Sequence, residues 1–359
     1  MKTKQPRLQL VQASRAIVPL LVILFHTSFV SNQYFNFNLL GLTKLSRIGG
    51  ADYFFVLTGF MMYYVYAKDF GIKEKFRPFL IKRFTRIIPY YWLLTIVMIV
   101  FFYFVPIGYG YGKNLQTMLN SFLLLPSQDF PIIYSAWSLR YTLLFYFVFS
   151  LFIYSNSRFM KTVVGLWIAS ILYFSITSTT FSNDFLAMIF NKINLEFVAG
   201  VCCAYYAMHR TIKHGMVFLI ASAIGFGYTW ISGVYNLWRF DETFMYTICA
   251  TALILGIVSI DMTRQIKLPR IFNYLGNASF SIYLVHPPFL GFVAAMLVKL
   301  GITSVIGSVG SIIVTMITVT IMGCLAHSYI EKPLVASMKN MIPKPKSAPL
   351  LLRETSAKL

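Results

Sequence analysis

Apolar runs long enough to cross a lipid bilayer follow one another along almost the whole chain. Hydrophobic residues make up 58% of the 359 positions and charged residues only 12%, which is about half the charged share of a soluble domain. The core of a bilayer is about 30 Å thick and needs roughly 20 apolar residues per helical crossing. A membrane β-barrel would show alternating segments of about ten residues, whereas these runs are continuous. We therefore predict an all-α, polytopic membrane protein.

We expect about ten transmembrane helices. The sixth is predicted to be broken or re-entrant, because Asn191, Lys192, Asn194 and Glu196 interrupt its apolar run. The ten spans are expected at residues 10–30, 50–66, 87–105, 134–154, 162–180, 185–207, 216–232, 244–260, 274–298 and 305–328.

Basic residues give this threading an orientation. With the N-terminus in the cytoplasm, the inner segments hold 23 of the 31 Lys and Arg residues and the outer segments hold five. This excess on the inner side predicts that both termini are cytoplasmic. A net charge of +20 would suggest a nucleic-acid partner in a soluble protein. Here membrane orientation and anionic lipid headgroups account for it, so we expect membrane lipids and no nucleic acid among the partners.

The N-terminal run resembles a signal peptide in outline, because basic residues precede an apolar stretch. It contains Arg15 and His26, however, and shows no small-residue cleavage site, so it is predicted to remain as the first helix. One transmembrane domain is expected over residues 1–335, followed by a short basic cytoplasmic tail over 336–359. The four cysteines lie inside apolar runs without metal-ligand spacing. They are predicted to be buried apolar side chains, and no metal site is expected.

Ionisable residues within the spans are candidates for function, because charge is unfavourable in a bilayer. Arg15 and His26 are eleven residues apart, close to three helical turns, so they share one face about 16 Å apart along the axis. A histidine in this position can act as a general base near neutral pH, or it can simply bond the backbone of a neighbouring helix. The five ionisable candidates are Arg15, His26, Arg140, Glu196 and His286.

A pair of arginines precedes the third span at the expected cytoplasmic boundary. Arg83 and Arg86 have i, i+3 spacing, which places both guanidinium groups on one helix face. Paired arginines suit phosphate or carboxylate ligands through bidentate hydrogen bonds. The alternative is ordinary positive charge anchoring the inner end of a span.

Two further positions have both a functional and a structural interpretation. His286 precedes Pro287 and Pro288, and prolines leave backbone carbonyls without partners, which is tolerated only where protein or a cavity satisfies them. A functional cavity there is one interpretation. Asp52 opens the second span, where it is either part of a site or a simple acid at a helix N-terminus.

Six short motifs occur in an order that resembles the acyltransferase 3 family of membrane O-acyltransferases, over nearly the whole chain. The motifs are Arg15 with Phe25-His26-Thr27, the run 51–60 around Asp52, Arg83-Phe84-Thr85-Arg86 with Ile87-Ile88-Pro89-Tyr90, Ala136-Trp137-Ser138-Leu139 with Phe145-Tyr146, the run 275–286 ending at His286, and Ile330-Glu331-Lys332-Pro333.

The resemblance implies ten core helices and an O-acetyltransferase of the bacterial plasma membrane. Its donor would be cytoplasmic acetyl-coenzyme A, used as a co-substrate with no bound cofactor, and its acceptor a hydroxyl of a cell-envelope glycan. His26 would be the catalytic residue, and Arg15, Arg83 and Arg86 would bind the donor. The chain resembles the stand-alone members, which lack an appended hydrolase-like domain. Supporting or substrate-contacting roles are expected for Asp52, Trp137, Tyr141, Glu196, His286 and Glu331.

One position departs from the family pattern. Many members carry a glutamate just before the Phe-Tyr pair, where this chain has Thr142. The chain must therefore use another acid, with Asp52 and Glu196 available, or none. Two other functions remain open: a glycan or lipid-linked sugar exporter, and a membrane partner without activity.

The acceptor side is less defined by sequence. The outer segments 31–49 and 106–133 are rich in aromatic residues, including Tyr109, Tyr111 and Phe130, and Tyr134 follows them. Such side chains suit sugar rings, but they also collect at membrane interfaces. Both interpretations stay open at this point.

Overall fold

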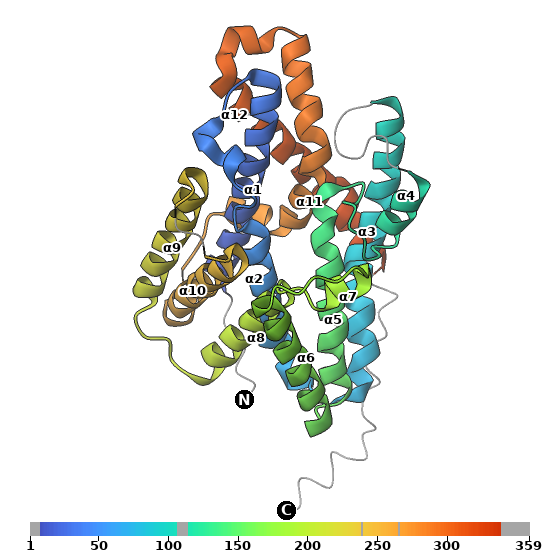
Figure 1. Ribbon diagram of the computed structural model, residues 1–359, viewed down its shortest axis with the longest axis vertical. Helices are drawn as coiled ribbons and strands as arrows, with labels where there is room; N and C mark the ends of the chain where they lie inside the picture. The colour runs from blue at the N-terminus through green and yellow to red at the C-terminus, as the bar shows by residue number, and fades with distance from the viewer. Residues whose placement is uncertain (1–7, 106–113, 238–239, 265, 339–359) are drawn as a thin grey trace, which may run out of the picture.

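The computed structural model describes residues 8–105, 114–237, 240–264 and 266–338, which form helices and connecting turns with no β-strand in these ranges (Figure 1). Residues 339–359 of the predicted tail 336–359 and the predicted aromatic residues Tyr109 and Tyr111 lie outside them. The helices are α1 (Gln9–Phe35), α2 (Gly50–Tyr66), α3 (Phe76–Phe104), α4 (Leu115–Phe122), α5 (Trp137–Tyr154), α6 (Arg158–Ile176), α7 (Asp184–Ile189), α8 (Asn194–His209), α9 (Gly215–Tyr235), α10 (Glu242–Thr263), α11 (Arg270–Lys299), α12 (Ile302–Ala326) and α13 (Lys332–Met338).

The all-α, multi-pass prediction is confirmed. Nine helical segments in the described part of the chain are long and apolar enough to cross a membrane. The expected second span forms α2, which has 17 residues and is therefore about 26 Å long. It packs against α8 and α10 in the interior of the bundle. At the edges, α6 buries only Ile171, so most of its side chains are free to face lipid.

Helices distant in sequence pack side by side around the centre of the molecule. The first helix, α1, packs along α11 and α12, and these three rise together in Figure 1. The helix α3 packs against α5, and α9 packs against α10. This arrangement brings α1, α2, α3, α5 and α11 around a common space, in which most of the predicted site residues are found.

Two glycines allow α2 and α8 to approach each other closely. A Cβ atom on Gly59 would lie 2.0 Å from the carbonyl oxygen of Phe197, and one on Gly200 would lie 1.9 Å from the carbonyl oxygen of Val56. Only glycine fits at such contacts. Small residues commonly mediate close helix packing in membranes, where apolar burial gives little driving force.

The interruption expected in the sixth span is present. It separates α7 from α8, and the side-chain amide of Asn194 donates to the carbonyl oxygens of Met188 and Ile189 at 2.9 and 3.1 Å. These bonds satisfy carbonyls at the end of α7 that have no helical partner. Lys192, inside the break, forms an ion pair with Asp241 at the start of α10. The polar residues that interrupt the apolar run thus stabilise the break through their own hydrogen bonds and ion pair.

The third span begins earlier than its hydropathy indicated. We expected residues 87–105, but α3 starts at Phe76. Lys and Arg are good helix formers, so the basic segment continues the helix toward the predicted cytoplasmic side. Arg83 and Arg86 therefore lie inside α3, which agrees with the helix face predicted for them.

Candidate active site

Two histidines from opposite ends of the chain meet in the bundle. The Nδ1 of His26 on α1 lies 2.9 Å from the Nε2 of His286 on α11, and the rings stack with centroids 5.0 Å apart and an angle of 22°. His286 is fully buried. Both residues were predicted as site residues, but nothing in the sequence indicated that they touch, because 260 residues separate them.

The hydrogen bonds of this pair define which nitrogen carries each proton. The Nδ1 of His286 lies 3.2 Å from the carbonyl oxygen of Ile282, which can only accept, so this nitrogen is the donor. With both rings neutral, the Nε2 of His286 is then an acceptor and the Nδ1 of His26 donates to it. The Nε2 of His26 consequently keeps its lone pair, which a general base or nucleophile requires.

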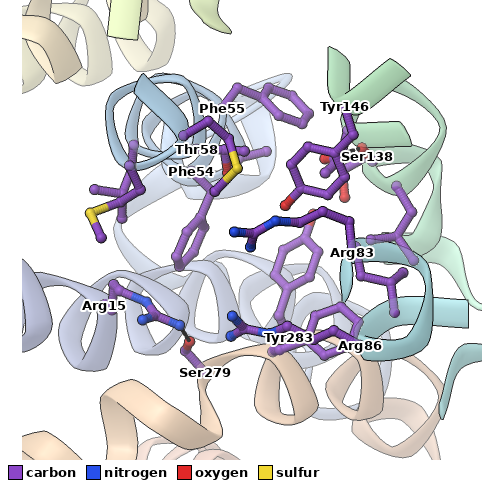
Figure 2. A pocket seen from close by; sticks show the side chains of 18 of the residues that line it. Arg15, Phe54, Phe55, Thr58, Arg83, Arg86, Ser138, Tyr146, Ser279 and Tyr283 are labelled. Atoms are coloured by element: carbon purple, nitrogen blue, oxygen red, sulfur yellow. Dashed lines mark hydrogen bonds between the residues drawn. The ribbon is translucent and has the colours of Figure 1, made fainter. Parts of the chain in front are cut away.

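A cavity of about 390 Å³ lies between α1, α2, α3, α5 and α11. Its cationic residues are Arg15, Lys82, Arg83 and Arg86, and no described residue that lines it is acidic. Figure 2 shows the guanidinium groups of Arg15, Arg83 and Arg86 around one space. The structure thus brings together all three residues predicted to bind a donor and adds Lys82, which the sequence analysis did not single out.

The arginines are held at different depths. Arg83 is 8% exposed, and its guanidinium lies over the Tyr66 ring at 4.9 Å. Its Nε has no hydrogen-bond partner in the described part of the chain. Arg15 bonds Gln12 and Ser279 at 3.3 and 3.4 Å. Lys82 and Arg86 are exposed, so the positive charge extends from the opening of the cavity to a buried guanidinium whose donors are not saturated.

The cavity adjoins the histidine pair through Tyr283. This tyrosine lines the cavity, and its ring centroid lies 5.8 Å from that of His286. His26 itself is not a lining residue. On the other side, the ring of Tyr134 contacts His26 edge-on at 5.8 Å.

Thr142, where the resemblance led us to expect a glutamate, lies in the wall of this cavity. Its hydroxyl donates to the carbonyl oxygen of Ser138 at 3.0 Å, one turn earlier on α5. The hydroxyl is thus occupied within its own helix. The chain has a cavity wall without negative charge where a carboxylate was expected.

Asp52 and Glu196 form a separate cluster with Arg47 at the start of α2 and α8. The Oδ1 of Asp52 lies 2.6 Å from the Nη1 of Arg47, and Glu196 is completely buried beside them. Burial lowers the pKa of Arg47, but the attraction and hydrogen bond of Asp52 outweigh it and raise this pKa above its ordinary value. Neither carboxylate lines the cavity. The structure therefore places both away from the position of Thr142.

Glu331 links two helices at the end of the bundle. Its Oε2 accepts from the Ser281 hydroxyl at 2.6 Å and lies 2.7 Å from the Nδ1 of His327. His327–Glu331 forms a single π-helical turn after α12, a geometry that is often found at functional sites. Here it fixes the last helices against α11.

Trp137 and Tyr141 lie on α5 but line a second space, which we call the outer pocket. It has a volume of about 250 Å³. Arg140, which the sequence analysis noted as ionisable but did not assign to the site, lies between them. The residues lining the outer pocket are 126–130, Trp137, Arg140, Tyr141, Asp184, Ala187, Met188 and Asn191.

No cluster of three or more His, Cys, Asp or Glu side chains suited to a metal ion occurs among the residues that the structure describes. The chemistry available at the site is that of an imidazole pair and arginines. Such a set can bind anionic groups and transfer protons or acyl groups.

Comparison with known proteins gives two findings. The chain matches the family described as "Acyltransferase domain" over residues 11–327. It is also similar to the exopolysaccharide production protein ExoZ of Rhizobium meliloti (strain 1021), with 26% identity over 329 residues, covering 87% of this chain and 94% of that protein. No solved structure matches the chain.

Proposed function

We propose that this chain, which belongs to the acyltransferase 3 family, moves an acetyl group from cytoplasmic acetyl-coenzyme A to a hydroxyl of a cell-envelope polysaccharide. The observation that carries the proposal is the cavity of four cations beside a histidine pair. The similar protein in Rhizobium meliloti is named for exopolysaccharide production, which supports a glycan acceptor. The many apolar helices and the basic inner loops support a place in the cell membrane.

The donor is expected to enter from the basic end of the cavity. Coenzyme A carries several phosphates, and guanidinium groups bind phosphate through paired hydrogen bonds. The exposed Lys82 and Arg86 would receive the phosphates first, and the buried Arg83 and half-buried Arg15 would hold groups deeper in the cavity. The acetyl thioester would then approach Tyr283 and the histidine pair.

His26 is expected to carry the chemistry at its Nε2. As a general base, it takes the proton of the sugar hydroxyl while the oxygen attacks the thioester carbonyl. The carbon–sulfur bond then breaks, and the coenzyme A thiolate receives the proton. As an acyl carrier, the same nitrogen attacks the thioester, the carbon–sulfur bond breaks and coenzyme A leaves as the thiolate. The sugar hydroxyl then attacks the acetyl group on the imidazole, the carbon–nitrogen bond breaks, and the hydroxyl proton passes to the thiolate. In both routes His286 positions His26 by accepting the hydrogen bond from its Nδ1.

The direct test compares envelope glycans from strains with the gene, without it, and with a His26→Ala chain, using mass spectrometry of O-acetyl groups. We expect O-acetylation to disappear in the deletion strain and in the His26→Ala strain at normal protein level. His209→Ala, an exposed histidine at the end of α8, is the matched control. Unchanged O-acetylation in the His26→Ala strain would contradict the proposal, and loss of surface polymer without any acetyl change would favour export.

A further inference from the structure

The helix α5 separates two differently built spaces. Ser138, Thr142 and Tyr146 line the cation-rich cavity, and their four-residue spacing places them along one face of the helix. Trp137, Arg140 and Tyr141 line the outer pocket from another face of the first turns. The start of α5 therefore forms a wall that contacts the donor cavity on one side and the outer pocket on the other.

A buried arginine shapes the outer pocket. Arg140 is 7% exposed, and its Nη1 donates to the carbonyl oxygen of Ser127 at 2.8 Å. Both of its Nη atoms also reach the carbonyl oxygen of Asp129 at 3.4 Å. Its Nε, in contrast, has no hydrogen-bond partner within the described ranges. Arg140 thus holds the loop 127–129 in place, and its buried Nε remains able to donate a hydrogen bond.

The lining of the outer pocket has the chemistry that sugars require. Trp137 and Tyr141 provide aromatic surface, with ring centroids 6.1 Å apart, and the apolar face of a sugar ring packs against such surfaces. Polar side chains line the same pocket: Asp184 and Asn191 can bond hydroxyl groups, and Asp129 offers its Oδ1, since its Oδ2 already accepts the Thr117 hydroxyl at 2.8 Å. The volume of about 250 Å³ is below the roughly 300–1,000 Å³ of drug-sized ligand sites, which suits one sugar unit of a longer chain.

Aromatic contacts connect the outer pocket to the catalytic histidine. Phe130 lines the pocket, and its ring centroid lies 4.5 Å from that of Tyr134. Tyr134 in turn contacts the ring of His26 at 5.8 Å. Two aromatic rings, Phe130 and Tyr134, therefore link a sugar held in the outer pocket to His26.

We propose that the outer pocket binds the acceptor, and that it takes an uncharged sugar unit stacked on Trp137 and Tyr141 with its hydroxyls bonded to Asp129 and Asp184. The two carboxylates outnumber the single arginine, which is already bonded to the loop, so an anionic sugar is disfavoured. This assignment rests on the proposed acetyl transfer and adds to it the place and charge class of the acceptor.

The test measures sugar binding apart from catalysis. The full-length protein in lipid nanodiscs is titrated with oligosaccharides released from the host's own surface polysaccharide and stripped of O-acetyl groups. Wild type and the inactive His26→Ala chain are expected to bind equally. Asp184→Asn and Trp137→Leu are expected to weaken binding about fivefold or more, as loss of one hydrogen bond or stacking surface predicts. The apparent affinity for acetyl-coenzyme A should stay unchanged in both.

The matched controls are Asp69→Asn, in the turn after α2, and Trp92→Leu on α3, neither of which lines the outer pocket. Sugar affinity that is unchanged in both Asp184→Asn and Trp137→Leu would overturn the assignment, as would a wild-type protein that binds none of the oligosaccharides. Because binding is measured in the inactive His26→Ala chain as well, a failure of acetyl transfer is seen separately from a failure of the pocket.

Discussion

The cation-rich cavity and the outer pocket share α5 as a wall but differ in charge. The cavity has four basic residues and no acidic residue in its described lining. The outer pocket has one arginine, already bonded to backbone carbonyls, together with two aspartates and three aromatic rings. This difference in charge means that the two spaces suit different ligands: a polyanion in the cation-rich cavity, and a molecule rich in hydroxyl groups in the outer pocket.

Aromatic side chains connect the histidine pair with both spaces. Tyr283 connects His286 with the cavity, and Tyr134 connects His26 with the outer pocket by way of Phe130. A reaction at this position would take its donor from one side and its acceptor from the other. With Thr142 in place of a glutamate, the described lining of the cavity carries only positive charge, because a carboxylate at this position would reduce the positive potential of the cavity.

The largest effect is expected from His26→Ala, which removes the reacting group common to both sides. Transfer of acetyl groups to glycan should fall by about 10²- to 10⁴-fold, the typical contribution of a general base. Binding of acetyl-coenzyme A and of oligosaccharide should both persist. The measurement is radiolabelled acetyl transfer by the purified protein. Retained activity would show that His26 is not the reacting group that the two spaces share.

A large and one-sided effect is expected from Arg83→Gln. The charge-assisted hydrogen bonds of a buried arginine are worth about 1.5–3 kcal/mol, so the apparent donor affinity should weaken roughly 10- to 150-fold. Oligosaccharide affinity should not change, because Arg83 lines the cation-rich cavity and not the outer pocket. Arg77→Gln is the control, since this exposed arginine lies on the same helix and outside the cavity. Equal donor affinity in the two variants would indicate that Arg83 only anchors the inner end of the helix in the membrane.

A smaller effect is expected when the hydrogen bond between the histidines is removed. His286→Phe keeps a ring but offers no acceptor to the Nδ1 of His26, so kcat should fall about tenfold while the donor KM stays the same. His286→Gln places an amide oxygen near the lost nitrogen and should recover part of the activity. If the Gln chain is no more active than the Phe chain, His286 acts through packing alone.

The smallest effect is expected from Thr142→Val. The Thr142 hydroxyl donates to the carbonyl oxygen of Ser138 within its own helix. Its loss should therefore change kcat/KM by no more than about twofold, because the bond is local and holds no other helix. A loss of tenfold or more would mean that this hydroxyl takes over part of the role expected of a glutamate. The same kinetic assay, run beside wild type, measures it.

Much of the fold could be predicted, because its signals are local. Apolar length predicted the helices, and the polar residues 191–196 predicted the break between α7 and α8. The start of α3 was missed by eleven residues, since hydropathy detects the part of a helix that needs lipid and not the basic turns that continue it. The ionisable candidates within the spans could also be singled out one by one, because such groups are rare in a bilayer.

The sequence alone determined that this chain crosses the membrane many times and that Arg15, His26, Arg83 and Arg86 are candidates for chemistry. Arg15 and His26 were singled out because a bilayer restricts charge so strongly that each exception is informative, and Arg83 and Arg86 because of their i, i+3 spacing next to the third span. Only the tertiary structure decided that His26 meets His286, that four cations share one cavity, and that Arg140 helps to build a second pocket beside it. These facts depend on α1 packing on α11 and on the two faces of α5, and contacts between residues far apart in sequence arise from packing that no local pattern records.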